Sequence, residues 1–363
     1  MKNRHYIIPI FVPHEGCPHD CVFCNQDSIT GETEKVTGDV VRRIIKEYIK
    51  TIELNNDLSK TVEVSFFGGT FTGIDLEKQK ELLSVARDYK EDGIIEYIRL
   101  STRPDYIDET ILEHLRSYKV DIIELGVQSL DEDVLQASRR GHSVEDVRKA
   151  CTLIKEYGFT LGIQIMLGLP RDNMNKDIET AKEVIRLKPD IARIYPALVI
   201  KNTAMEIMCK QNIYNPYSLE ECINIGKIIY AMLVSSGINV IRVGLQPTEE
   251  INEECELVTG PFHPAIRELI EGTLINDMIY YQLKDLNHLK SIIIKVNSRD
   301  VSKLYAYKKK FFGELKQKIG NISVRVEQDN NVDRNDVIVE FEQNSVKLHL
   351  MNYMKEISEE FIK

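Results

Sequence analysis

Cys17-Pro18-His19-Asp20-Cys21-Val22-Phe23-Cys24 places three cysteines close together with the spacing C-x3-C-x2-C. Three thiolates at this spacing can hold a cubane iron–sulfur cluster through three of its four irons. Complete cysteine ligation makes an electron carrier, whereas an iron without a protein thiolate can bind a substrate. The pattern therefore predicts a 4Fe–4S cluster on Cys17, Cys21 and Cys24 that has one open iron.

Two other uses of these cysteines are less suitable. A zinc site would need a fourth ligand at short spacing, and His14 and His19 are the candidates. His19 lies inside the loop, where it is badly placed to complete a tetrahedron. A disulfide framework does not suit a large chain with seven cysteines. We do not expect a second cluster, because no short spacing joins cysteines 151, 209, 222 and 255.

Length and composition predict one large domain and a smaller one. The chain has 363 residues, a net charge of −10 and 43% hydrophobic residues. It contains no apolar run of membrane-spanning length and no signal-peptide pattern, so we expect a cytoplasmic protein with no membrane partner. The acidic balance argues against bulk nucleic-acid binding and leaves room for a local basic patch.

Short apolar runs alternate with helical periodicity over the first two thirds of the chain. This alternation predicts parallel βαβ units, whose chemistry lies at the C-terminal ends of the strands. The cysteine loop directly follows the first strand and should lie at that edge. The predicted strands are Tyr6–Val12, Val62–Phe67, Glu96–Ser101, Asp121–Val127, Thr160–Leu167 and Ile191–Pro196. The predicted helices between them are Asp39–Leu54, Leu76–Tyr89, Asp108–Ser117, Val144–Tyr157 and Lys176–Leu187.

Further motifs follow the later strands. In the first of these motifs, FFGGTFTG (66–73), the paired glycines would let a ligand approach the backbone, because no Cβ stands in the way. The motifs are FFGGTFTG (66–73), STRPDY (101–106), GVQS (126–129), RRGH (139–142), IQIMLGLP (163–170), IYPALVIKNT (194–203) and VGLQP (243–247).

Together with the cysteine loop, this ordered set resembles the radical S-adenosylmethionine (SAM) superfamily over about residues 5–270. It is most similar to the radical SAM domain of the Elongator catalytic subunit, and more distantly to oxygen-independent coproporphyrinogen oxidases. The resemblance implies an α/β fold with a partial (β/α)6 TIM-like barrel. It also implies SAM chelated at the open iron and cleaved reductively to a 5′-deoxyadenosyl radical.

The resemblance assigns roles to individual residues. The cluster cysteines are catalytic as well as metal-binding. Contacts to SAM are implied for Phe23, Gly68, Gly69, Thr70, Thr102, Gln128, Ser129, Arg140, Gln164, Met166 and Tyr195. Contacts to substrate are implied for Arg103, Lys201 and His263.

Several of these residues also have a plain structural interpretation. Arg103 would pair with a carboxylate in a helix-capping loop, where Asp105 or Asp108 caps the next helix. Arg140 would be a solvated cation at a helix end. Met166 would belong to the barrel core, and Lys201 would be a surface lysine.

The expected domains are a barrel over residues 1–205, its C-terminal extension over 206–287, and a small α/β module over 288–363. In the module we expect a strand at Ser291–Val296, one basic helix at Val301–Ile319, and further strands at Ser323–Glu327 and Asp336–Phe341. This order resembles RNA-binding KH-like folds, whose GXXG loop clamps nucleotides. The corresponding segment has Lys308-Lys309-Lys310 but no glycines, so a solvated basic face is the alternative.

The function expected from these features is radical modification of RNA, with a tRNA base as the substrate. One alternative is a radical SAM oxidoreductase acting on a small molecule such as a tetrapyrrole. Another is a non-catalytic iron–sulfur sensor. The expected partners are an electron donor of flavodoxin or ferredoxin type and tRNA. The Elongator subunit also carries an acetyltransferase domain, but no glycine-rich acetyl-CoA loop occurs here, so we expect no acetyl-CoA.

Overall fold

The computed structural model describes residues 4–12, 17–25, 35–54, 60–245, 256–286 and 289–362. The chain divides into two compact units. The first comprises Met1–Pro216 and Gln246–Gly260, and the second comprises Tyr217–Leu245 and Pro261–Lys363. The division predicted at residues 205 and 287 stays a prediction. Within the described residues, no helix is long and apolar enough to cross a membrane.

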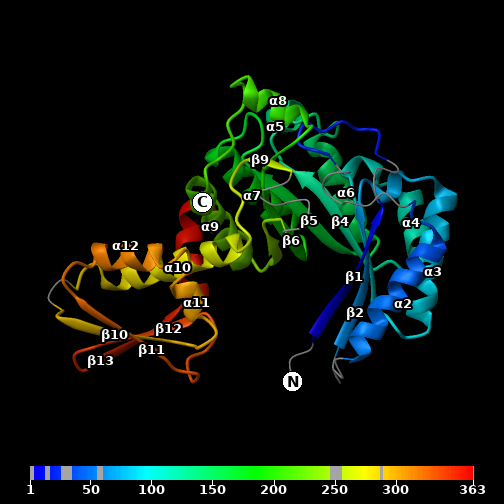
Figure 1. Ribbon diagram of the computed structural model, residues 1–363. Helices are drawn as coiled ribbons and strands as arrows, with labels where there is room; N and C mark the ends of the chain where they lie inside the picture. Colours follow the sequence, from blue (N-terminus) through cyan, green and yellow to red (C-terminus); the bar gives the residue numbers. More distant parts are fainter. Residues whose placement is uncertain are drawn as a thin grey trace. The chain divides into compact units, whose positions relative to one another are not determined.

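A curled parallel sheet forms the centre of the first unit (Figure 1). Neighbouring strands follow the order of the chain, and every pair is parallel. The predicted α/β fold with a partial TIM-like barrel is confirmed. The strands are β1 (Arg4–Val12), β2 (Lys60–Gly68), β3 (Tyr97–Thr102), β4 (Ile122–Gln128), β5 (Thr160–Leu167) and β6 (Ile191–Pro196).

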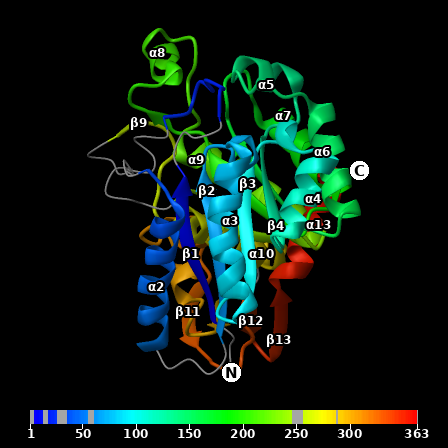
Figure 2. The same cartoon turned by 90° about the vertical axis from the view of Figure 1, so that its right-hand side faces the viewer.

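Helices connect these strands, as parallel pairing requires. Figure 2 shows α2, α3 and α4 along the outer side of the sheet. Polar caps begin most of the helices: Asp75, Asp108, Asp131, Ser143 and Asn173 accept backbone N–H bonds at the starts of α3 to α7. The helices are α2 (Gly38–Leu54), α3 (Leu76–Glu91), α4 (Glu109–Ser117), α5 (Glu132–Ala137), α6 (Val144–Glu156), α7 (Met174–Leu187) and α8 (Ala204–Lys210). Short strands β7 (Val199–Ile200) and β9 (Leu257–Thr259) pair antiparallel.

A buried ionic network joins four strands of the sheet. Arg99 on β3 lies between two carboxylates: its Nε is 2.7 Å from Glu63 Oε1, and its Nη1 is 3.2 Å from Glu124 Oε2. Arg193 on β6 completes the network, with Nε 3.0 Å from the same Glu124 oxygen. Glu63, Arg99 and Glu124 are all at most 3% exposed. The two positive and two negative charges therefore compensate one another where water is excluded.

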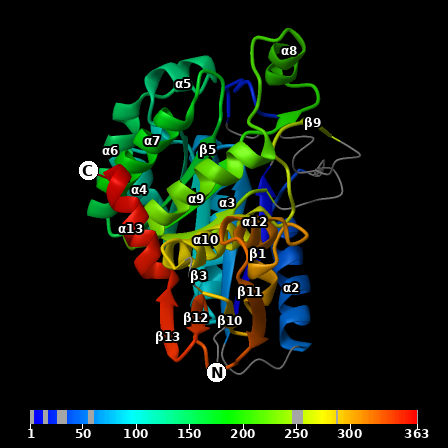
Figure 3. The same ribbon diagram turned by 90° about the vertical axis from the view of Figure 1, so that its left-hand side faces the viewer.

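The second unit contains a mixed four-stranded sheet with the order β11-β10-β12-β13. Helices α10 and α12 lie beside each other over this sheet, and α13 packs on α9 (Figure 3). The strands of this sheet are β10 (Ser291–Val296), β11 (Ser323–Gln328), β12 (Asp336–Phe341) and β13 (Asn344–His349), whereas β8 (Asn239–Val243), also in this unit, does not belong to it. The helices are α9 (Leu219–Ser235), α10 (Ile266–Leu283), α11 (Val301–Leu304), α12 (Lys310–Lys318) and α13 (Leu350–Ile362).

The prediction of one basic helix over 301–319 is wrong. The helix ends at Leu304, and a new one begins at Lys310. Between them Tyr307, Lys308 and Lys309 have φ angles of 54°, 53° and 68°. Left-handed backbone cannot continue a right-handed helix, and it is costly for residues with a Cβ. The apolar periodicity of the segment gave no sign of this break.

Candidate active site

The cysteine loop lies beyond the C-terminal end of β1, as the sequence predicted. Cys21 is buried, whereas Cys17 and Cys24 are half-buried. Backbone hydrogen bonds fix the loop: Val22 N donates to Ser138 O over 3.1 Å, and Met205 N donates to Val22 O over 2.7 Å. The loop is therefore attached to the segments after β4 and β6, which lie far along the chain.

Two guanidinium groups face the Cys21 sulfur. Arg140 Nη1 lies 3.2 Å from Cys21 Sγ, and Arg103 Nη1 lies 3.9 Å from it. Both arginines are buried. Both guanidinium groups can donate hydrogen bonds to this sulfur.

The three thiols are not arranged around a single metal ion. Within the part of the chain that the structure describes, no three His, Cys, Asp or Glu side chains converge on such a position. A cubane places its thiolates on different irons, so its ligands need not converge on one point. His14, the zinc-ligand candidate before the loop, lies outside the described residues.

Arg103 has the carboxylate partner that its structural interpretation requires, and its expected substrate contact stays a prediction. Its Nε and Nη2 form a bidentate pair with Asp105 at 3.0 and 2.9 Å, as the capping-loop alternative requires. The helix cap itself is Asp108, which accepts from Ile111 N. Arg103 nevertheless also approaches the Cys21 sulfur and donates to the Arg140 carbonyl.

Arg140 is not a solvated cation at a helix end, because only 6% of it is exposed. Its Nη2 donates to the Gly126 carbonyl, and its Nε lies 3.4 Å from His142 Nε2. Burial, followed by the charges of Arg140 and Arg103, lowers the pKa of His142 to about 4. His142 is therefore neutral near pH 7, and its Nε2 can accept the Arg140 hydrogen bond.

His19, which the sequence offered only as an ill-placed zinc ligand, joins the same cluster. Its Nε2 lies 3.5 Å from Asp105 Oδ2, and its ring meets Tyr106 edge-on. Gly141 has a φ of +77°, and a Cβ there would overlap the His19 ring. The glycine of the RRGH motif therefore makes room for a side chain of the cysteine loop. The position of His19 between two cysteines was the available signal.

The Gly-Gly segment has one structural glycine and one accessible one. Gly68 has a φ of +112°, and a Cβ there would overlap the Val12 carbonyl oxygen. Because Gly68 has no side chain, β1 and β2 can approach each other closely here. Gly69 is half-buried. The next residue, Thr70, is 1% exposed, and its hydroxyl has no hydrogen-bond partner among the described residues.

A pair of glutamines and a separate apolar cluster include residues from the ends of β4 and β5. Gln164 Nε2 donates to Gln128 Oε1 over 3.1 Å, and Gln128 has a left-handed φ of 70° at an irregularity in the sheet. Phe23 and Met166 pack against the same buried cluster, which includes Leu169. Phe23 and Met166, both expected to contact SAM, thus lie against one cluster, and the two glutamines are hydrogen-bonded to each other.

Two predicted residues have partners within the protein. Ser129 Oγ lies 3.4 Å from Thr180 Oγ1 and accepts from Asp131 N. Thr102 Oγ1 lies 2.6 Å from Thr72 Oγ1. Both Ser129 and Thr102 are buried, and these bonds fix the loops that follow β4 and β3.

Tyr195 on β6 and the residues expected to contact substrate are more dispersed. The Tyr195 hydroxyl accepts from Arg193 Nη1 over 3.1 Å. Lys201 is exposed, and its carbonyl accepts from Asn25 Nδ2. His263 belongs to the second unit, where its ring meets Tyr307 edge-on. The predicted loop residues Gln246, Pro247 and Cys255 lie outside the described residues.

The donor set fits a thiolate-bound cluster with an amino acid-like ligand beside it. Cys21 supplies a sulfur faced by cations, and Thr70 supplies a buried hydroxyl with no protein partner. Burying a hydroxyl without a hydrogen bond is costly, so a bound polar group would compensate Thr70. The apolar pair of Phe23 and Met166 and the amides of Gln128 and Gln164 suit a nucleoside.

Comparisons with known proteins agree with this geometry. A family model described as the radical SAM superfamily matches residues 11–184, and a radical SAM C-terminal domain model matches residues 189–276. The tRNA uridine(34) acetyltransferase of Methanocaldococcus jannaschii is 29% identical over 260 residues, covering 60% of this chain and 47% of that protein. Elongator complex protein 3 of Homo sapiens is 28% identical over 263 residues, covering 61% and 48%.

A solved structure shows the same fold. The archaeal Methanocaldococcus infernus Elp3 with an N-terminal deletion superposes with a TM-score of 0.59 at 22% identity, covering 74% of this chain and 62% of that one. The chain spans about half the length of the curated relatives it matches. The family matches, the cysteine loop and the fold together show that this chain is an enzyme of the radical SAM superfamily.

Proposed function

We propose that this protein binds a 4Fe–4S cluster through Cys17, Cys21 and Cys24, binds SAM beside it, and modifies RNA. The observation that carries the proposal is the buried Cys21 sulfur at the strand ends, which faces Arg103 and Arg140. When bound, the cluster supplies the electron that cleaves SAM to methionine and a 5′-deoxyadenosyl radical. A reductant of flavodoxin or ferredoxin type would deliver that electron.

The protein groups in this proposal bind, orient and exclude water. Arg140 and Arg103 stabilise the Cys21 thiolate and hold the loop in place. Gly69 leaves space for the methionine end of SAM, and the Thr70 hydroxyl offers it a hydrogen bond. Other contacts proposed for the nucleoside end come from Phe23, Gln128, Ser129, Gln164, Met166 and Tyr195.

The names of the relatives support tRNA as the substrate class. The M. jannaschii and M. infernus relatives act on uridine 34 of tRNA according to their names. Because this chain spans about half of each, acetyl transfer is not part of the proposal. What we propose to be shared is radical chemistry on an RNA base.

The test is anaerobic incubation of the reconstituted protein with dithionite, SAM and total tRNA. We expect 5′-deoxyadenosine to form, and a new nucleoside to appear when the tRNA is digested and analysed by mass spectrometry. A parallel incubation replaces tRNA with a small-molecule extract. A product in that incubation alone would contradict RNA modification and favour the small-molecule oxidoreductase.

Gly69→Val should weaken SAM binding by about tenfold or more, which corresponds to about 1.4 kcal/mol. The added side chain would occupy the space proposed for the methionine end. Isothermal titration of the reconstituted protein with SAM measures the effect. Gly313→Val is the control, because a Cβ at Gly313 meets nothing within 4 Å. Unchanged SAM affinity in a folded Gly69→Val protein would contradict the placement of SAM.

Replacing Lys308, Lys309 and Lys310 by alanine should reduce the salt dependence of tRNA binding. Each lost phosphate contact lowers the slope of log K against log salt, so the triple variant should lose up to about 3 units. Lys310 should contribute least, because it is already paired with Glu220 at 3.1 Å. Filter binding at several salt concentrations measures the slope, and cleavage of SAM without substrate should be unaffected. An unchanged slope would leave these lysines as a solvated basic face.

A further inference from the structure

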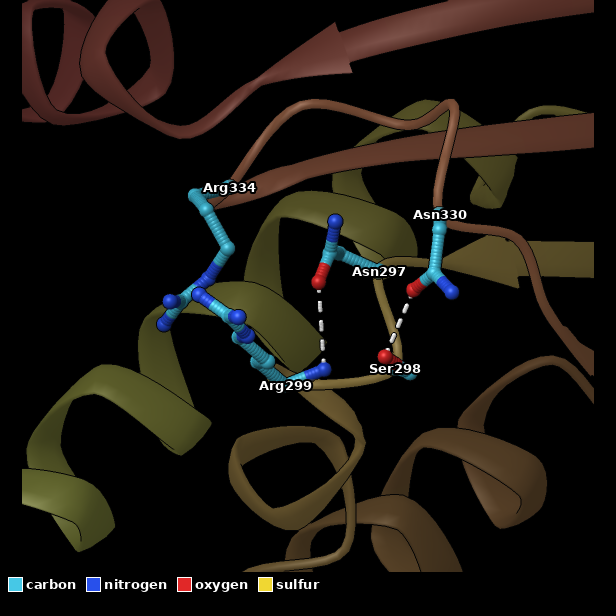
Figure 4. Close-up of a pocket in the computed structure, with 5 residues that line it drawn as sticks. All are labelled: Asn297, Ser298, Arg299, Asn330 and Arg334. Carbon is cyan, nitrogen blue, oxygen red and sulfur yellow. Dashed lines mark hydrogen bonds between the residues drawn. The ribbon is translucent and has the colours of Figure 1, made fainter. Parts of the chain in front are cut away.

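A polar pocket lies in the second unit, at the C-terminal end of β10. It has a volume of about 340 Å³, within the range of small-ligand sites. Two loops form it: residues 297–299 follow β10, and residues 330–334 connect β11 to β12. The lining residues are Asn297, Ser298, Arg299, Asn330 and Arg334 (Figure 4). No acidic side chain is among them.

Hydrogen bonds between the two loops hold the pocket in shape. Ser298 Oγ donates to Asn330 Oδ1 over 2.6 Å, and Asn297 Nδ2 donates to the Val332 carbonyl over 2.9 Å. Within the first loop, Arg299 N donates to Asn297 Oδ1 over 3.1 Å. A pocket that is already formed loses less entropy when a ligand binds.

A buried carboxylate outside the pocket orients one of the two arginines. Asp300 is 2% exposed, and it accepts from Arg334 Nε and Nη2 at 2.9 and 2.8 Å. It also accepts from Asn335 N, which fixes the end of the second loop. Arg334 is 41% exposed despite this pair, so part of its guanidinium still faces outward.

Arg299 supplies a positive charge that the protein does not neutralise. It is exposed, and no carboxylate of the described residues lies within ion-pair distance of it. The Asp300 carboxylate is already shared by Arg334 and Lys303. The pocket walls therefore carry net positive charge, together with amide and hydroxyl groups that donate and accept hydrogen bonds.

We propose that this pocket binds a phosphate group of an RNA strand. Guanidinium forks match the geometry of phosphate oxygens, and the absence of a carboxylate in the lining avoids repulsion. The amides of Asn297 and Asn330 can bond a neighbouring 2′-hydroxyl or base edge. This inference rests on the proposed RNA substrate and adds a contact separate from Lys308–Lys310.

The test measures binding of a fluorescent single-stranded RNA to the full-length, reconstituted protein by anisotropy. Arg299→Glu should raise Kd by about tenfold and reduce the salt slope by about 1 unit, as expected for one lost phosphate contact. Arg299→Lys keeps the positive charge but loses the forked guanidinium, so its Kd should lie between those of the wild type and Arg299→Glu. Arg325→Glu is the matched control: this β11 arginine is 75% exposed, is paired with Glu327 and does not line the pocket. It should change Kd by less than about twofold.

Two results would overturn the pocket assignment. One is an Arg299→Glu protein that binds RNA as tightly as the wild type. The other is an equal loss in the Arg325→Glu control, which would show a general effect of charge. Arg299→Gln replaces Arg299→Glu if thermal melting shows that the latter is unfolded.

The same assay separates this inference from the proposed function. Titration with inorganic phosphate and with adenosine monophosphate tests whether the ligand is a free phosphate. Binding of either one that depends on Arg299, without RNA binding, would overturn the RNA assignment. RNA binding that is insensitive to Arg299, combined with modification of tRNA, would leave the proposed function intact and the pocket assignment wrong.

Discussion

Cys21→Ala should abolish both the cluster and the cleavage of SAM. Cys21 is the most buried of the three loop cysteines, and its sulfur is the one that Arg103 and Arg140 face. Its removal leaves two thiols, and two buried guanidinium groups lose the sulfur that they face. We expect iron to fall from about four per chain to background after anaerobic reconstitution. Formation of 5′-deoxyadenosine should fall to the rate without enzyme.

Cys151→Ala is the matched control for this change. Cys151 is buried in α6, and burial raises the pKa of its thiol to about 12, so it stays protonated and inert. The control should keep its iron and its cleavage activity. Iron retained by Cys21→Ala, iron lost from Cys151→Ala, or about eight irons in the wild type would contradict the three-cysteine cluster.

Arg99→Met should destabilise the first unit by about 3–5 kcal/mol. The arginine joins Glu63 and Glu124 in a region that water does not reach. Its removal leaves the buried Glu124 carboxylate with Arg193 and deprives the buried Glu63 carboxylate of its guanidinium partner. Chemical denaturation, followed by circular dichroism, measures the loss as a lower midpoint with an unchanged slope.

An exposed ion pair provides the comparison for Arg99. Arg148 Nε lies 2.8 Å from Glu183 Oε1, but the Arg148 side chain is 49% exposed. Arg148→Met should therefore cost less than about 1 kcal/mol. A second variant combines Arg99→Met with Glu63→Gln and should recover part of the loss, because it removes one uncompensated charge. Equal effects of Arg99→Met and Arg148→Met would show that the network contributes little to stability.

The local patterns in the sequence predicted the parallel βαβ units and the position of the cysteine loop, whereas the partial barrel was implied by the family resemblance. Apolar runs that alternate with helical periodicity require parallel strands, since a helix must carry the chain back across the sheet. The loop follows the first strand directly, so its edge of the sheet was fixed by adjacency alone. The paired glycines Gly68 and Gly69 are likewise visible in the sequence, but their expected role at SAM came from the family resemblance.

Only the tertiary structure decided which side chains meet at the loop. Arg103 and Arg140 are separated from Cys21 by 82 and 119 positions, and the return of each strand to the same edge brings them together. From the sequence alone, a solvated cation at a helix end was the structural alternative for Arg140. Its burial depends on the Gly126 carbonyl and on His142, which no spacing pattern connects to the cysteines.

In the second unit, too, local sequence patterns predict the strands, whereas contacts between separated segments do not follow from them. Its strands could be predicted from β-rich apolar runs, but the break between α11 and α12 was missed. Tyr307, Lys308 and Lys309 adopt left-handed backbone there, although the segment between the two helices contains no glycine or proline that would indicate a break. The pocket lined by Arg299 and Arg334 requires two loops about thirty residues apart to be joined by hydrogen bonds. Sequence periodicity reports which face of an element is buried, whereas the sheet order decides which loops become neighbours.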